Sequence, residues 1–251
     1  MVTTTAPPAP ARHAPADWTR KYAFATGLFY LITFAASIPA AFYFITPVLD
    51  DPGYIVGPGA DTRVVVGCLL DVVNALAAVA TAVAFYPVGR RLNESLALGF
   101  VTTRMFEAAV IMVGVLSLLA VVALRQDAGG SVGADQASLV TTGQALVAVR
   151  DYTFQFGPNI GAALNALMIG TILYRSRLVP RILPAMGLLA VVPLLLAAVA
   201  TVLGLTEQGS AWFAPGGALI FVWELSLGLY LTVKGFKPSA LTAAAPQEPA
   251  P

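Results

Sequence analysis

Long apolar runs recur along the 251-residue chain and are separated by short polar segments. A helix needs about 20 residues to cross the roughly 30 Å hydrocarbon core of a bilayer. The runs that reach this length are residues 22–45, 64–86, 97–124, 152–174, 182–205 and 212–233. They are continuous rather than alternating, which favours helices over the strands of a barrel. The pattern predicts an all-α integral membrane bundle of about six transmembrane helices.

Composition supports a membrane location, since 58% of the residues are hydrophobic and 11% are charged. Soluble proteins carry about 25% charged residues, so we expect the apolar surface of this chain to contact the lipid bilayer. The net charge of +1 gives no reason to expect a nucleic-acid partner. The single His13 and the single Cys68 leave no ligand set for zinc, haem or an iron–sulfur cluster. We expect no metal and no cofactor.

The two ends of the chain differ from the apolar centre. Residues 1–19 and 238–251 are rich in Pro and Ala and have no periodic apolar face, which is typical of disordered segments. The sequence therefore predicts two disordered cytoplasmic tails that flank a six-helix transmembrane domain over residues 20–237.

The positions of the basic residues predict how the bundle is oriented. Ten of the 14 Lys and Arg residues lie in the terminal segments and in the loops after residues 64–86 and 152–174. The opposite loops hold mainly acidic residues. Short loops rich in Lys and Arg stay on the cytoplasmic side, so we expect both termini to be cytoplasmic.

The region before the fourth apolar run is less clear. In residues 138–149 the apolar positions approximate helical spacing, which favours a helix lying on the outer membrane interface. Gly157 and Pro158 follow, and two interpretations are open. Either they begin the fourth helix, with Pro in its first turn, or they kink a longer one.

Two charged residues, Arg104 and Glu107, interrupt the third apolar run. If that helix enters the bilayer near Ala97, Arg104 lies about 10 Å and Glu107 about 15 Å deep. If the span is instead the stretch that ends at Leu124, Arg104 lies at the membrane edge and its side chain reaches the headgroups. The spacing of three residues permits an ion pair in either register.

Two more polar residues are expected at the same depth. Glu224 precedes Lys234 by ten residues, and Asn165 precedes Arg175 by ten, which places both about 15 Å from the cytoplasmic side. Glu224 has no basic neighbour on its own helix. We expect Arg104, Glu107, Asn165 and Glu224 to meet inside the bundle and to form a binding site.

A secondary polar pair, Asp71 and Asn74, lies one helical turn apart in the second apolar run. By the same reckoning it is nearer the outer side. We therefore expect Asp71 to be too distant to pair with Arg104.

Three functional hypotheses follow from this polar cluster. Buried ionisable groups often mark ligand or ion routes, which favours a membrane-embedded small-molecule, lipid or ion binding or transport-like protein. The alternative is a structural or regulatory subunit of another membrane protein, or a homo-oligomer, in which polar residues serve helix packing. An intramembrane hydrolase would rest on Glu107 and Glu224 alone, because the sequence has no HExxH, GxSxG or phosphate-binding Gly loop. We expect no enzyme activity and assign no catalytic residue.

Three stretches carry a resemblance to a known family: FYPVGRRLNESLALGFVTTRMFEA, ILYRSRLVPRILPAMGLL and WELSLGLYLTVKGF. They resemble signature stretches of a bacterial multi-pass membrane family, domain of unknown function 4386, over roughly residues 20–236. The resemblance implies a multi-pass fold in the bacterial plasma membrane and no particular activity. Asn165 stands where such proteins often have His, which weakens any proton relay through that position.

Overall fold

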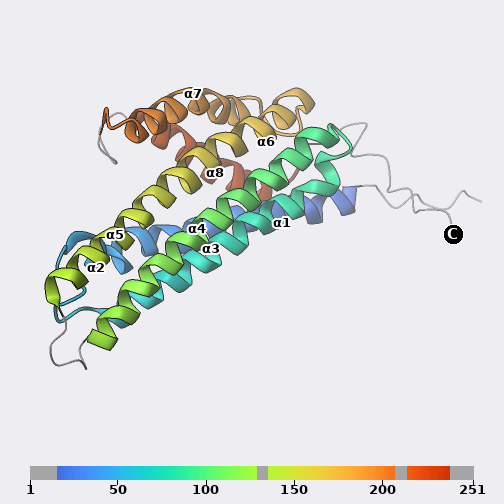
Figure 1. Cartoon of the computed structure of the whole chain (residues 1–251). Helices are drawn as coiled ribbons and strands as arrows, with labels where there is room; N and C mark the ends of the chain where they lie inside the picture. The colour runs from blue at the N-terminus through green and yellow to red at the C-terminus, as the bar shows by residue number, and fades with distance from the viewer. Residues whose placement is uncertain (1–15, 129–134, 207–213, 238–251) are drawn as a thin grey trace, which may run out of the picture.

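The computed structural model describes residues 16–128, 135–206 and 214–237, and in these ranges the chain is mostly helical and has no strand (Figure 1). The predicted all-α class is confirmed. The elements in chain order are α1 (Ala16–Pro39), η1 (Ala40–Phe44), α2 (Thr46–Asp50), α3 (Asp61–Gly89), α4 (Glu94–Ala128), α5 (Gln136–Phe154), η2 (Gln155–Gly161), α6 (Ala162–Ser176), α7 (Ile182–Val202) and α8 (Ala214–Val233), where η marks a π-helical segment.

Among the described residues, six helices are long and apolar enough to cross a membrane, as the hydropathy pattern predicts. The first of them continues from α1 into η1. Helix α1 begins at Ala16, so its first turn falls within the segment 1–19 that the sequence assigns to a tail. The rest of that predicted tail, residues 1–15, and the predicted tail 238–251 lie outside the described residues.

The fourth spanning helix is much longer than the sequence predicts. Helices α5 and α6 join through η2 into one continuous helix of 41 residues, Gln136–Ser176. Gly157 and Pro158 lie inside η2, so they interrupt a longer helix and do not begin a new one. The segment 138–149 belongs to this helix and packs against α4, which contradicts the prediction of a separate interfacial element.

The spanning helices form a closed ring in chain order. Helix α1 contacts α3, α3 contacts α4, α4 contacts α6, α6 contacts α7, α7 contacts α8, and α8 packs back against α1. Figure 1 shows α5 and α6 as one long diagonal helix, with α7 and α8 on one side of it and α3 and α4 on the other. Large side chains such as Phe85, Phe100 and Trp223 are fully buried inside the ring. Exposed leucines such as Leu76 and Leu189 face outward, as expected for a surface in contact with lipid.

The two ends of the bundle differ in their charges. At the basic end, the Arg20 guanidinium donates to the Thr232 and Val233 carbonyls at 3.2 and 2.9 Å, and the Arg91 guanidinium lies 4.4 Å from a Trp18 ring centroid. At the acidic end, Arg125 Nη1 lies 2.6 Å from Asp61 Oδ2. At each end, side chains thus connect residues that are far apart in the sequence.

Tyr54 stabilises the loop at the acidic end. Its hydroxyl donates to Asp61 Oδ1 at 2.8 Å. Burial raises the pKa of the Tyr54 phenol above its usual range, and the Asp61 carboxylate raises it further. The phenol therefore stays a hydrogen-bond donor across the physiological pH range.

Candidate functional site

An arginine shared by two carboxylates lies at the centre of the ring. Arg104 Nη1 lies 2.9 Å from Glu107 Oε2 on the same helix, and Arg104 Nη2 lies 2.8 Å from Glu224 Oε1 on α8. Arg104 is 2% exposed. Its side chain therefore points into the bundle.

The predicted fourth member of the cluster joins it through hydrogen bonds. Asn165 on α6 is fully buried, and its Nδ2 donates to Glu107 Oε2 at 2.6 Å. Thr103 Oγ1 in turn donates to Asn165 Oδ1 at 2.5 Å. Glu107 thus accepts from two donors on two helices. The structure brings together all four predicted residues, and Thr103 is an addition that the sequence analysis did not identify.

Aromatic rings enclose the Arg104 guanidinium. Its Cζ lies 5.0 Å from the ring centroid of Tyr30 on α1 and 5.6 Å from that of Phe100 on α4. Both distances are within the range of cation–π attraction. Tyr30 could not be identified from the sequence, because an aromatic residue in an apolar run is ordinary. The rings help to hold a charge that is otherwise costly to bury.

A second buried ion pair lies nearer the acidic end. Arg150 Nη2 on α5 lies 3.3 Å from Asp71 Oδ2 on α3, and both residues are less than 10% exposed. Asp71 is thus separate from Arg104, as the depth estimate predicts. The apolar run predicted for the fourth helix begins at residue 152, which leaves Arg150 in the outer loop before it. This prediction is wrong, because the fourth spanning helix begins at Gln136 and carries Arg150 into the bundle.

The two π-helical segments lie beside these ion pairs. Pro39 immediately precedes η1, and Pro158 lies within η2. Proline lacks an N–H group and clashes with the preceding turn, so a wider turn relieves the helix at these positions. Within η2, Asn159 Nδ2 donates to Gln155 Oε1 at 3.1 Å. Such wider turns often occur at functional sites.

A cavity of about 380 Å³ joins the two ion pairs. Its polar lining contains both pairs together with the predicted secondary residue Asn74 and with Asn159 of η2. Its apolar lining comes mainly from α1, η1 and the first half of α8: Phe34, Ile38, Phe42, Ile220 and Phe221. Asn165 does not line the cavity, but its amide donates a hydrogen bond to Glu107, which does.

The cavity opens on the outer surface of the bundle. Among its lining residues, Phe42 is 80% exposed and Phe221 is 43% exposed. Toward the acidic end, α8 and α1 diverge (Figure 1). Apolar side chains such as Phe42 and Phe221 are typical of a surface in contact with the hydrocarbon of a membrane. A molecule with a polar part and an apolar part fits such a site.

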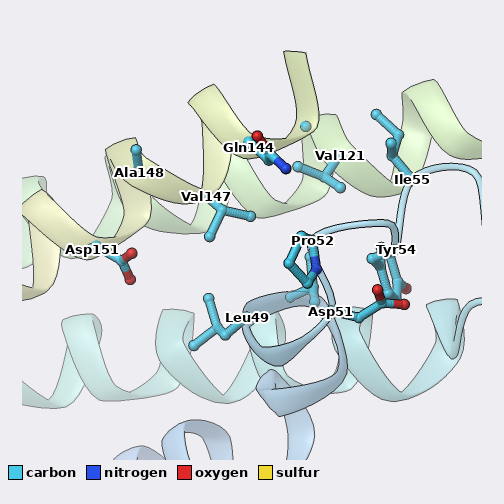
Figure 2. A pocket seen from close by; sticks show the side chains of 12 residues that line it. Leu49, Asp51, Pro52, Tyr54, Ile55, Val121, Gln144, Val147, Ala148 and Asp151 are labelled. Carbon is cyan, nitrogen blue, oxygen red and sulfur yellow. The ribbon is translucent and has the colours of Figure 1, made fainter. Parts of the chain in front are cut away.

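A smaller hollow of about 230 Å³ lies between the α2–α3 loop and α5 (Figure 2). Its apolar walls include Leu49, Pro52 and Val147, and Asp51 and Asp151 lie at opposite ends of it (Figure 2). The Asp51 carboxylate accepts the Gly53 N–H at 2.8 Å, so it stabilises the loop. This hollow was not predicted from the sequence. Its apolar walls suit packing of the α2–α3 loop on α5.

The charged side chains that line the cavity are paired with one another in an apolar surrounding. Within the described residues, no group of three or more His, Cys, Asp and Glu side chains is placed to hold a metal ion. Both guanidinium groups are already paired with carboxylates. The arrangement can hold charges at fixed positions in an apolar surrounding, which strengthens their interaction with a ligand.

Comparison with known families gives a match that covers most of the chain. Residues 25–235 match the family described as domain of unknown function (DUF4386). This range contains every residue of the two buried ion pairs and confirms the predicted resemblance. Neither the curated proteins nor the solved structures gave a match.

Proposed function

The chain belongs to the family of domain of unknown function 4386, and on this basis we propose that it is a bacterial plasma-membrane protein that binds a small amphiphilic molecule inside its bundle. The observation that carries the proposal is the cavity of about 380 Å³ that joins two buried ion pairs. Ligand sites of small molecules commonly have volumes of about 300–1,000 Å³.

The burial of both ion pairs supports binding over simple packing. A buried ion pair contributes little net stability, because the cost of desolvating two charges offsets their attraction. Helices of this length can be joined by small residues and apolar contacts alone. Five charged side chains that border one cavity are therefore better explained by a ligand that needs them.

The alternative is a structural or regulatory subunit of another membrane protein or of a homo-oligomer. In that case Arg104 and Glu224 join α4 to α8, and the cavity holds only lipid tails or nothing. We propose no catalytic role for these residues.

Mass spectrometry of the protein purified from its membrane tests the proposal. Gly217 lines the cavity, and a side chain added there meets open space. Gly217→Trp should therefore fill the cavity without disturbing the helices. Leu196→Trp, at a residue that is 66% exposed on α7, is the matched control.

We expect the wild type and Leu196→Trp to retain the same small molecule or lipid, and Gly217→Trp to lose it. If all three proteins carry the same bound species, or none carries any, the cavity is not a binding site and the subunit alternative is favoured.

A further inference from the structure

The ionisable groups that line the cavity are not balanced. They comprise three carboxylates, on Asp71, Glu107 and Glu224, and two guanidinium groups, on Arg104 and Arg150. When all five are ionised, the cavity holds one negative charge in excess. These side chains are mostly buried within the bundle. Bulk water and salt therefore do little to screen the excess negative charge.

The excess is located on the α4–α8 side of the cavity. Asp71 is matched by Arg150 at 3.3 Å. Glu107 and Glu224 share the single Arg104, each at less than 3 Å. Two carboxylates therefore compete for one cation at this position.

The other elements packed around Glu224 do not supply a second cation. Helix α1 contributes the neutral Tyr30 phenol, and α6 contributes the Asn165 amide. Helix α7, Ile182–Val202, contains no charged residue. Arg150 on α5 lies across the cavity and is held by Asp71 on α3. An unbalanced charge in this setting destabilises the folded protein, so either a proton or a cationic ligand must balance it.

The walls of the cavity indicate which kind of cation fits. Phe34 and Phe221 meet edge to face with ring centroids 5.1 Å apart, and both line the cavity together with Phe154. Aromatic rings attract an organic ammonium group and repel an anion placed over their faces. An inorganic ion needs several oxygen ligands, whereas most of this lining is hydrocarbon.

We infer that the occupant is an amphiphilic organic cation, an ammonium group with a hydrocarbon part, whose charge is matched by Glu107 and Glu224. The hydrocarbon part lies among the phenylalanines toward the opening between α1 and α8. When the ligand binds, it replaces the balancing proton, which is released to water. The affinity for the ligand therefore rises with pH. This inference rests on the proposed function and adds the charge of the ligand to it.

Three probes with the same hydrocarbon tail and different head groups test the inference: decyltrimethylammonium, decanoate and 1-decanol. Binding is measured by scintillation proximity with the protein in nanodiscs of zwitterionic lipid, and empty nanodiscs correct for partitioning into lipid. We expect decyltrimethylammonium to bind at least about tenfold more tightly than decanoate. Its affinity should be higher at pH 8 than at pH 6, and Gly217→Trp should abolish its binding.

Glu224→Gln separates charge from shape. The amide can still accept from Arg104, and the remaining Arg104–Glu107 pair is neutral. We expect this variant to bind decyltrimethylammonium at least about tenfold more weakly than the wild type does, and to bind 1-decanol unchanged, which also shows that it is folded. Glu94→Gln, at an exposed glutamate in the first turn of α4, should change neither.

The outcomes separate the two proposals. If decanoate or decanol binds as tightly as the ammonium in a manner that Gly217→Trp abolishes, the inference fails and the proposed function stands. An unchanged ammonium affinity in Glu224→Gln also overturns the inference. If Gly217→Trp affects the binding of no probe, the inference and the proposed function both fail.

Discussion

Arg104 serves two carboxylates through two different nitrogens, and this geometry depends on the planar guanidinium. Nη1 pairs with Glu107, and Nη2 pairs with Glu224. A lysine ammonium at this position is a single point of charge and lacks the fixed fork. The residue therefore links α4 to α8 as well as neutralising charge.

Removing Arg104 should destabilise the protein more than removing an exposed charge. Arg104→Ala leaves Glu107 and Glu224 facing each other without a cation, and we expect a loss of about 3–5 kcal/mol. Arg104→Ala combined with Glu107→Ala should recover part of this loss. Unfolding of the protein in detergent by heat or denaturant measures the effect. Strictly additive losses would show that the two residues do not interact.

The sequence predicts this cluster well because helical geometry is regular. A spacing of three residues places Arg104 and Glu107 on one face, and counting from the basic loops gives the depth of Glu224 and Asn165. Arg150 was missed for a physical reason. The residues around it are polar enough to suggest a loop, and only the tertiary contact with Asp71 shows why an arginine belongs inside the bundle.

At the scale of the helices, hydropathy locates the membrane-spanning part of each element and not its ends. Helix α3 extends over Asp61–Gly89 and α4 over Glu94–Ala128, each several residues longer than its apolar run. The fourth helix shows the limit most clearly. Pro158 suggests a break, but a wider turn accommodates it within one continuous helix.

The contact between α1 and α8 closes the ring and depends on a glycine. A Cβ atom added at Gly27 would lie 2.5 Å from Thr232 Oγ1 and 2.6 Å from the Gly228 carbonyl oxygen. The helices touch backbone to backbone here. Small residues at such crossings are what allow the approach.

Gly27→Ala should therefore separate α1 from α8 and destabilise the bundle by about 1–3 kcal/mol. Gly217→Ala in α8 is the matched control, because its added methyl meets open space. We expect that control to be neutral or slightly stabilising, since Ala favours helix over Gly by about 1 kcal/mol. Thermal unfolding in detergent compares the two. Equal melting temperatures would contradict the close packing at Gly27.

At the scale of the whole molecule, the distribution of charge predicts the topology. The basic end carries Arg20 and Arg91 and the acidic end carries Asp61 and Asp127. Loops rich in Lys and Arg remain in the cytoplasm. We therefore propose that the basic end, with both chain termini, faces the cytoplasm and that the α2–α3 loop faces outward.

Cysteine labelling in intact cells tests this orientation. The native Cys68 is buried, and Cys68→Ser provides a background without thiols. Val56→Cys lies at the acidic end and Glu94→Cys at the basic end, and both positions are exposed. A membrane-impermeant maleimide should label Val56→Cys in intact cells and Glu94→Cys only after permeabilisation. The reverse pattern would contradict the proposed orientation.

The central claim is that Arg104, Glu107 and Glu224 meet inside the bundle and face a ligand cavity. Cryo-electron microscopy of the protein purified in nanodiscs of its native lipids, enlarged by a bound antibody fragment, tests it most directly. The account predicts density for a bound molecule in the cavity lined by Phe34 and Phe221, with its polar end near Glu224. A map in which side chains fill the cavity and Arg104 extends to the bundle surface, away from Glu224, would contradict the account.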